Sequence, residues 1–350
     1  MPGSSRRWNR SLARCHEASY SDTSGKRGHE GQVGVIHWAQ GPIVVALIHR
    51  LAIVGVGLIG GSLARALKRA KACEYVVGCA RDRERLKKAV ALGVIDEFNP
   101  DVGSAVRGAD MVVVATPLGT TKAVFESMAG QLNADAIITD AGSAKEQVVA
   151  AARAFLNGHF RLFVPGHPVA GTEKSGVEAS FAELFEGHRV ILTPLDETDA
   201  IAVERVQMMW EKTGAEVVTM GVEQHDRLLA AASHLPHVLA YSLVDCLTRM
   251  DERQDIFRFA AGGFADFTRI ASSNPRMWHD ICFANRDNLV RMLEQFGAHL
   301  DEIKEAIRRD DSQAVMEVLT RAKAARDDYA AERNTQSGTS KSGHDVDPES

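Results

Sequence analysis

The sequence has few cysteines, and no two of them stand at the spacing of a metal or redox motif. The 5 cysteines, at positions 15, 73, 79, 246 and 282, form no CxxC pair. A small, odd and dispersed set excludes a disulfide framework and a cysteine zinc site, so we expect no metal. Such a set is typical of a protein of the reducing cytoplasm.

Long hydrophobic runs and an excess of positive charge are also missing. No apolar stretch reaches the roughly 18 uninterrupted residues of a membrane helix, so we expect no membrane span. The 41 basic and 46 acidic residues leave a formal net charge of −5. Nucleic-acid binding requires clustered positive charge, so we expect no nucleic-acid partner either.

The remaining composition is that of a folded globular protein. Hydrophobic residues make up 45% of the chain and charged residues 25%, which excludes a wholly disordered or fibrous chain. The length of 350 residues predicts about two domains.

Both ends of the chain differ from the middle. Residues 1–47 are rich in Arg, Ser and Gly without apolar periodicity, which predicts a disordered extension. Two alternatives stay open: a transit peptide, and a translation start placed upstream of the true one near Val44 or Val45. Residues 333–350 are polar and predict a disordered tail, with no regulatory domain appended after residue 332.

The middle of the chain changes character once. In residues 48–220, short apolar runs alternate with helical patterns, which predicts an α/β domain with a parallel sheet buried on both faces. The runs are 51–54, 75–77, 111–114, 136–138, 162–164, 190–192 and 216–218. In residues 221–332 only long amphipathic stretches remain, at 222–250, 275–297 and 299–325, which predicts an all-α domain.

A glycine fingerprint follows the first apolar run and opens a helical pattern over 58–70. In this strand-to-helix context it indicates a Rossmann-type dinucleotide-binding domain for NAD or NADP, although a glycine turn without ligand remains the alternative. The first glycine permits the tight turn, the second lets the pyrophosphate approach, and the third lets the helix pack on the strand. The candidate cofactor-binding residues here are Gly55, Gly57, Leu58, Ile59 and Gly60.

The end of the second run bears on cofactor preference. An NAD site usually has an acidic residue there for the ribose, whereas this chain has Ala80 followed by Arg81. An arginine could pair with a 2′-phosphate, which favours NADP. Two alternatives remain: Asp82 serves NAD if the strand ends two residues later, or Arg81 is only a surface charge.

Two later strand ends should also face the cofactor, because ligands bind outside the carboxyl ends of parallel strands. They carry Thr116 and Pro117 after the run at 111–114, and Ser143 after the run at 136–138. Each has a structural alternative: Pro117 as the first residue of a helix, and Ser143 as the cap of a helix over 144–156.

Two further residues suggest chemistry. His167 follows the run at 162–164, where a histidine beside a nicotinamide could act as a general base. Arg269 lies in an apolar context and should have an anionic partner, because an unpaired buried charge is costly. The structural alternatives are a buried histidine without a role and an internal ion pair between Arg269 and Asp266.

Five segments together carry a resemblance that extends over about residues 49–330. They are GVGLIGGSLA, DAGSAK, GHPVAGTEKSG, SHLPHVLA and GGFADFTRIASSNPRMW. The chain thereby resembles the prephenate/arogenate (cyclohexadienyl) dehydrogenase family of tyrosine biosynthesis. The resemblance implies a Rossmann-type domain followed by an all-α substrate and dimerisation domain, and oxidative decarboxylation of prephenate, arogenate or both.

The resemblance also implies roles for particular residues. His167 would be the base and Ser143 would hold it in register, while Arg269 would bind the ring carboxylate. His234 would contact the substrate side chain. Four more residues would line, shape or gate the pocket, in part from a neighbouring subunit: Thr172, Glu173, Asp266 and Trp278.

A homodimer is expected, because the helical half carries more apolar surface than one copy should bury. The residues that suggest this are Phe283, Leu289, Met292, Leu293 and Phe296. Two rival functions are a 3-hydroxyacid or imine-reductase type dehydrogenase on a similar scaffold, and a non-catalytic NAD(P)-sensing module.

Overall fold

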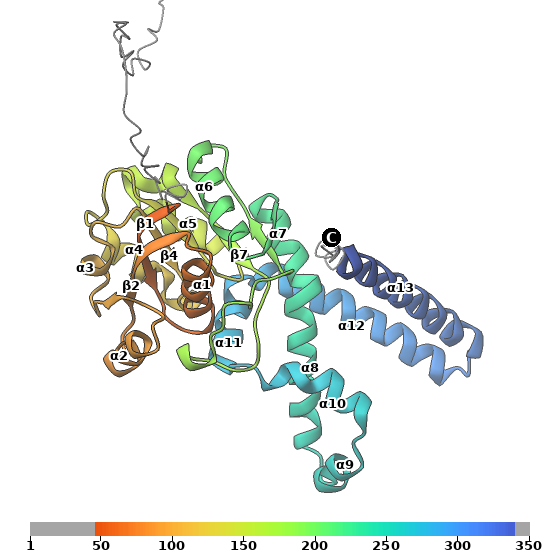
Figure 1. Cartoon of the computed structure of the whole chain (residues 1–350). Coiled ribbons are helices and arrows are strands. Elements are labelled where there is room, and N and C mark those ends of the chain that lie inside the picture. Colours follow the sequence, from red (N-terminus) through yellow and green to blue (C-terminus); the bar gives the residue numbers. More distant parts are fainter. Residues whose placement is uncertain (1–45, 340–350) are drawn as a thin grey trace, which may run out of the picture. The chain divides into compact units, whose positions relative to one another are not determined.

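The computed structural model describes residues 46–339, and a six-stranded parallel sheet forms the centre of its first half (Figure 1). The strand order is β3-β2-β1-β4-β5-β6. The strands are β1 Ile48–Val54, β2 Cys73–Cys79, β3 Glu97–Phe98, β4 Met111–Val114, β5 Ile137–Asp140 and β6 Phe163–Val164. The Rossmann-type α/β fold is therefore confirmed.

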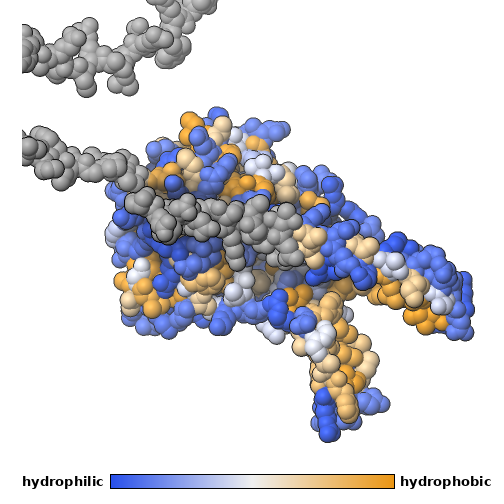
Figure 2. Space-filling view, turned by 45° about the vertical axis from the view of Figure 1, so that its right-hand side comes forward, coloured by the Kyte–Doolittle hydropathy of each residue, from blue (hydrophilic) through white to orange (hydrophobic). Residues whose placement is uncertain are grey.

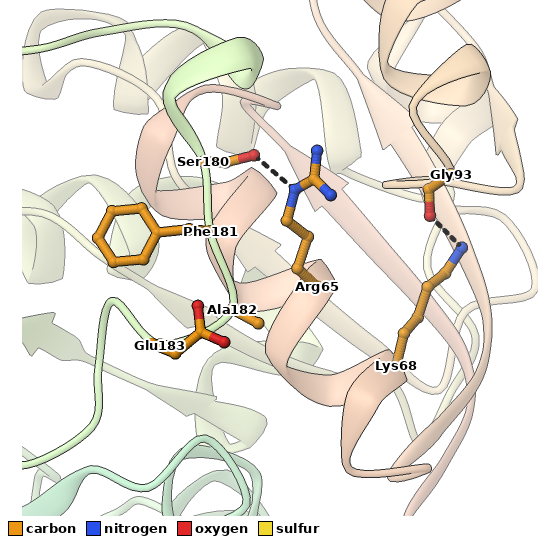
Figure 3. Close-up of a pocket in the computed structure, with 7 residues that line it drawn as sticks. All are labelled: Arg65, Lys68, Gly93, Ser180, Phe181, Ala182 and Glu183. Carbon is orange, nitrogen blue, oxygen red and sulfur yellow. Dashed lines mark hydrogen bonds between the residues drawn. The ribbon is translucent and has the colours of Figure 1, made fainter.

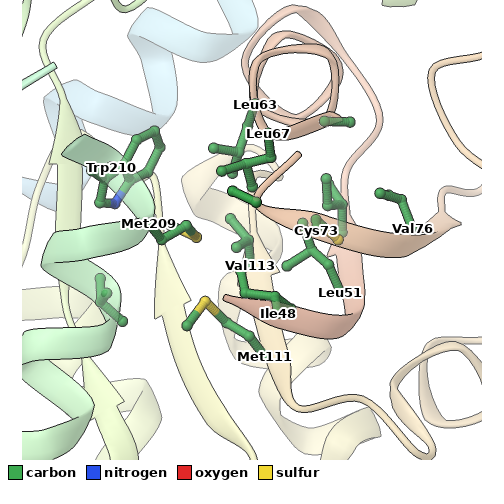
Figure 4. Close-up of a cluster of buried hydrophobic side chains, with 14 of the residues drawn as sticks. Ile48, Leu51, Leu63, Leu67, Cys73, Val76, Met111, Val113, Met209 and Trp210 are labelled. Atoms are coloured by element: carbon green, nitrogen blue, oxygen red, sulfur yellow. The ribbon is translucent and has the colours of Figure 1, made fainter. Parts of the chain in front are cut away.

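Alternate residues of each central strand pack into different hydrophobic clusters, because successive side chains of a strand point to opposite faces. Leu51 and Ile53 belong to one cluster, whereas Ala52 and Val54 belong to the other. Figure 4 shows the first cluster, in which Leu63, Leu67 and Trp210 lie over the strands. Burial on both faces explains why the strands are continuous apolar runs.

Helices cover both faces of this sheet. They are α1 Leu58–Arg69, α2 Arg83–Ala91, α3 Val102–Val106, α4 Thr121–Met128, α5 Glu146–Phe155 and α6 Ala200–Glu211. Helices α1, α2 and α6 contribute to the first cluster, and α3, α4 and α5 contribute to the second. Each large apolar side chain buried there stabilises the fold by about 1.5–3 kcal/mol.

The last two apolar runs do not join the parallel sheet. They form β8 Arg189–Leu192 and β9 Glu216–Thr219, which pair with β7 Gly166–Pro168 in a separate sheet. Strand β7 is antiparallel to β8, so the expectation of one parallel sheet was wrong in this part. The chain leaves the first sheet at Pro165, whose nitrogen cannot donate to a strand ladder.

The second half is helical throughout the residues described, as expected. Its α-helices are α7 Val222–Leu229, α8 Leu235–Thr248, α9 Arg253–Phe259, α10 Gly262–Thr268, α11 Pro275–Ala284, α12 Arg286–Arg308 and α13 Ser312–Thr339. The breaks differ from those expected: a π-helical turn over Ala230–His234 separates α7 from α8, and Asn285 separates α11 from α12.

The proposed domain limits remain a prediction. Helix α13 continues to Thr339, beyond the limit placed at residue 332. Nearly all of the extension over 1–47, and residues 340–350 of the tail, lie outside the described residues. Within the described part, no helix is long and apolar enough to cross a membrane, and no cluster of potential metal ligands occurs.

Candidate active site

The glycine fingerprint forms the turn between β1 and α1. Gly55 has φ +105°, and a side chain there would strike the carbonyl of Ala115. A side chain on Gly60 would strike the carbonyl of Gly55. Gly57 is different, because a Cβ there would meet no atom within 4 Å. Contacts within the chain therefore explain why Gly55 and Gly60 cannot carry a side chain. Beside Gly57, by contrast, the space is open.

That open space lies at the start of α1, whose first residues are Leu58 and Ile59. No side chain caps this helix end, and its first turn has no acidic residue. The amides of the first turn and the helix dipole are thus free to bind an anion. Nearby, the Thr116 hydroxyl is buried and has no hydrogen-bond partner among the described residues. These features fit a dinucleotide pyrophosphate.

The residues that follow β4 and β2 lie next to this turn. Pro117 precedes a short 3₁₀ turn over Leu118–Thr120, which agrees with its structural alternative without excluding cofactor contact. Strand β2 ends at Cys79, so Ala80 and exposed Arg81 come directly after it. Asp82 caps α2 by accepting the amides of Glu84 at 3.0 Å and Arg85 at 3.2 Å. Both capping bonds use Oδ1, while Oδ2 lies 3.2 Å from Nε of the exposed Arg85.

His167 lies in β7 and is 8% exposed. Its Nδ1 is 2.9 Å from Nε2 of His225, and Nδ1 of His225 is 2.7 Å from Oδ1 of Asp226. His225 and Asp226 are fully buried in α7. The two halves of the chain thus meet in a continuous His–His–Asp chain, and the sequence analysis assigned no role to its second and third members.

Asp226 also holds the start of α5. Its Oδ1 accepts the amide of Lys145 at 2.7 Å, and its Oδ2 accepts the amide of Glu146 at 2.9 Å. The structural alternative for Ser143 was wrong, because the helix begins at Glu146 and its first amides are bound by a carboxylate from α7. Ser143 therefore lies in the loop between β5 and α5.

The buried ammonium group of Lys145 lies beside the His–His–Asp chain. Nζ of Lys145 is 2.5 Å from Oδ2 of Asp140 and donates to the carbonyl of Gly166 at 2.6 Å. These bonds tie the end of β5 to the start of β7, the strand that carries His167. Burial lowers the pKa of Lys145, and the charges of Asp140 and Asp226 oppose that shift.

The surroundings keep His167 neutral. Burial lowers its pKa well below 6.5, and the neighbouring His225, Lys145 and His234 lower it further. A neutral imidazole has one unprotonated nitrogen, which is the form that a general base requires.

His234 is buried beside Ser143, and its hydrogen bonding is incomplete. It ends the π-helical turn, and burial lowers its pKa to about 4. Its Nδ1 is 3.1 Å from the amide nitrogen of Asn285, so the proton of the neutral ring resides on Nε2. That Nε2 is buried and makes no hydrogen bond of ordinary geometry among the described residues, while a weaker hydrogen bond with the backbone of Ser143 raises the pKa of the ring against the effect of burial. An unsatisfied buried donor indicates a site for a ligand acceptor.

Trp278 of α11 packs next to His234. It is 7% exposed, and its ring stacks on His237 with centroids 3.7 Å apart. The edge of His234 faces it at 6.1 Å. Sequence reasoning placed Trp278 near the substrate, and the structure brings it against the histidine that was expected to bind the substrate side chain.

Arg269 bonds to Glu173 in the loop that follows β7. The structural alternative of an ion pair with Asp266 was therefore wrong, and Asp266 is exposed. Thr172 is exposed in the same loop, where its hydroxyl accepts the amide of Lys174 at 3.2 Å. The structure thus brings Arg269 to the segment that continues from His167, whereas Asp266 makes no ion pair among the described residues.

A separate hollow of about 470 Å³ lies over α1, away from these residues. Figure 3 shows Arg65, Lys68 and Ser180 among its lining. Its cations are already bound, since Arg65 donates to Ser180 at 3.0 Å and Lys68 pairs with Asp96 at 2.7 Å. It contains none of the candidate site residues.

Two family models match the chain. The model described as "prephenate dehydrogenase, nucleotide-binding domain" matches residues 63–219, and "prephenate dehydrogenase, dimerization domain" matches residues 221–321. Similar proteins include the cyclohexadienyl dehydrogenase of Zymomonas mobilis, 39% identical over 81% of this chain and 96% of that protein. The prephenate dehydrogenase of Bacillus subtilis is 38% identical over 79% of this chain and 74% of that protein.

Solved structures give the same result. The prephenate dehydrogenase of A. aeolicus, in complex with hydroxyphenyl propionate and NAD⁺, is 38% identical with a TM-score of 0.75. The match covers 80% of this chain and 98% of that one. Synechocystis arogenate dehydrogenase is 27% identical with a TM-score of 0.68, over 80% of this chain and 99% of that one.

Proposed function

The chain belongs to the prephenate dehydrogenase family, and we propose that it performs the oxidative decarboxylation of prephenate, arogenate or both in tyrosine biosynthesis. It is an oxidoreductase with a nicotinamide dinucleotide cofactor. The observation that carries the residue assignment is the buried, neutral His167, joined through Nδ1 to the second half of the chain. Its Nε2 is left for the substrate.

The substrate of this reaction is a cyclohexadiene with a hydroxyl on C4 and a carboxylate on C1. The nicotinamide supplies the hydride acceptor for the hydrogen on C4. His167 takes the hydroxyl proton through Nε2, and the bond from C1 to the carboxylate breaks to release CO₂. The electron pair of that bond completes the aromatic ring, and the C4 oxygen recovers its proton from His167. The base therefore only holds a proton during turnover, and positioning matters more than nucleophilicity.

Other residues would orient the ring. Arg269 would bind the C1 carboxylate, for which a guanidinium fork is well shaped. The Nε2–H of His234 would donate to an oxygen of the substrate side chain, and Ser143, whose backbone lies against His234, would hold the reacting hydroxyl. Trp278 would form the wall of the pocket. Thr172 and Glu173 would form its rim.

The experiment that tests this function is a crossed assay of the purified chain. Prephenate and arogenate are each offered with NAD⁺ and with NADP⁺, and the absorbance of the reduced nicotinamide is followed. Turnover of at least one acid is expected. Cofactor binding without turnover of either acid would support a non-catalytic nucleotide-sensing module instead.

We propose that Arg81 makes NADP the preferred cofactor. Replacing it, as Arg81→Ala, should raise KM for NADP⁺ by about 10-fold or more, since a charge-assisted bond contributes about 1.5–3 kcal/mol. KM for NAD⁺ should change little. Arg83→Ala, at another exposed arginine nearby, is the matched control. Equal effects on both cofactors would remove Arg81 from the preference.

A second copy of this chain is the proposed partner, because the helical half exposes many apolar side chains (Figure 2). Phe283 is 65% exposed, whereas Leu289 is buried within one copy, so that part of the expectation was wrong. Other exposed apolar residues of this half are Phe257, Phe259, Phe267, Val290, Leu300, Ile307, Met316 and Leu319. A monomer mass in light scattering would contradict a dimer. The described cysteines are unpaired, which suits the proposed cytoplasmic location.

A further inference from the structure

We propose that Asp226 acts through His225 to fix the tautomer of His167, with the proton on Nδ1 and the lone pair on Nε2. Asp226 and His225 would then be positioning residues, because they act on the substrate only through His167. This inference rests on the proposed role of His167 as base.

The argument begins at Asp226, which receives three donors. The amides of Lys145 and Glu146 and the His225 ring all contact its carboxylate, at 2.7–2.9 Å. Burial opposes ionisation, but these bonds together hold the pKa of Asp226 below its ordinary value. An ionised carboxylate can only accept hydrogen bonds, so Nδ1 of His225 must carry a proton.

The next step follows from the neutrality of His225. Burial lowers its pKa, although the bond to Asp226 and the charge of Asp140 oppose this. A neutral imidazole has one protonated nitrogen, so Nε2 of His225 is an acceptor. The nitrogen facing it at 2.9 Å is Nδ1 of His167, which must therefore donate.

This leaves His167 with a lone pair on Nε2, the atom that would take the hydroxyl proton. Once it has done so, the resulting imidazolium lies one histidine away from the Asp226 carboxylate. The other charged groups nearby, Lys145 and Asp140, already pair with each other. Asp226 is thus the counter-charge aligned with the ring of the base.

Asp226 also caps α5, so a control variant is needed that removes a carboxylate cap from another helix. Asp199 caps α6 in a comparable way, accepting the amides of Ile201 at 2.9 Å and Ala202 at 3.2 Å. It bonds to no histidine among the described contacts. Asp199→Asn therefore reproduces the loss of a carboxylate cap without touching the His–His–Asp chain.

The first experiment compares Asp226→Asn with Asp199→Asn in the full chain. Oδ1 of Asp226 accepts both the Lys145 amide and the His225 ring, so the side-chain oxygen of the asparagine keeps these two bonds while the negative charge is lost. The imidazolium then has no aligned counter-charge, and we expect kcat to fall by about 10-fold or more, since a hydrogen bond to a charged group contributes about 1.5–3 kcal/mol. Affinity for the cofactor should persist, and Asp199→Asn should retain kcat.

The pH profile separates positioning from folding. The titratable groups that face the histidine pair are Asp226 of α7, Lys145 before α5, Asp140 of β5 and His234 of the π-helical turn. Removing the Asp226 anion destabilises the imidazolium, so the acid limb of kcat should move to lower pH. A purely structural role would lower kcat without moving that limb.

The second experiment reads the tautomer directly by ¹⁵N NMR of histidine-labelled protein without substrate. The His167 signal is assigned by its loss in His167→Asn. Protonation on Nδ1 is expected in the unmodified chain, whereas Nε2 protonation there would overturn the inference. His225→Gln, whose side-chain oxygen can replace the lost acceptor, should retain more kcat than His225→Leu; equal losses would also count against it. Failure of the crossed assay would instead reject the proposed function, because the NMR reading needs no turnover.

Discussion

Replacing the proposed base, as His167→Asn, is expected to lower kcat by about 10²–10⁴-fold while the fold and cofactor binding persist. An Asn side chain has no nitrogen that can take a proton. It still offers an amide N–H toward Nε2 of His225, so the contact that holds the first half to α7 can survive. Steady-state kinetics with the preferred acid and cofactor titration by fluorescence would measure the two effects separately.

His188→Asn is the matched control for this variant. His188 is an exposed histidine just before β8, the strand that pairs with the strand of His167. It should retain normal kcat. Near-normal turnover in His167→Asn would show that another group takes the hydroxyl proton.

The pH profile of the unmodified enzyme follows from the same assignment. The base works in its neutral form, and burial lowers the pKa of His167 well below 6.5. The rate should therefore hold as the pH falls through 6.5 and decline only below it. An acid limb at or above the ordinary histidine pKa would contradict a buried, neutral base.

The strands of the first half could be predicted because their cause is local. Leu51, Ala52, Ile53 and Val54 are buried on alternating faces, so the run is apolar without interruption. The second sheet could not be predicted in this way. Its strands pair across long sequence separations, and nothing in the pattern at 190–192 indicates which partner the run will choose.

Some residues of the candidate site could be proposed from the sequence, and others could not. His167, Arg269 and Trp278 stand in segments whose combination is distinctive, so sequence reasoning could propose them. His225 and Asp226 stand in an amphipathic segment, where a polar pair normally indicates a solvent-exposed helix face. They are buried because α7 packs against β7, α5 and α12. The signal that was available is an adjacent His–Asp pair in the first helix after the last strand.

The role of Asn285 could not be predicted from the sequence for a comparable reason. The apolar periodicity continues from 275 to 297, so the pattern does not indicate the break between α11 and α12. The structure buries this side chain, which donates to the carbonyl of Asp226 at 2.7 Å and accepts from Asn288 at 2.9 Å. These bonds orient its amide nitrogen toward Nδ1 of His234. A residue that interrupts a helix thereby fixes the donor of a neighbouring histidine.

Replacing the proposed carboxylate ligand, as Arg269→Ala, is expected to raise KM for the ring acid by roughly 10- to 100-fold with little change in kcat. Decarboxylation removes the charge that the guanidinium binds, so this bond stabilises the bound substrate at least as much as the transition state. A loss of kcat with unchanged KM, measured by initial rates over substrate concentration, would contradict that role.

Replacing Glu173 tests the same prediction, because its carboxylate binds the guanidinium of Arg269 to which the substrate carboxylate would bind. An exposed ion pair contributes only about 0.2–1 kcal/mol, so Glu173→Gln should lower KM by no more than about 5-fold. The pair between Arg153 and Glu197 is a close match, with side-chain exposures of 59% and 39% against 65% and 38%. Arg153→Ala removes an equivalent surface arginine and should leave KM unchanged. If it raised KM as Arg269→Ala does, the effect would reflect lost surface charge and not a carboxylate ligand.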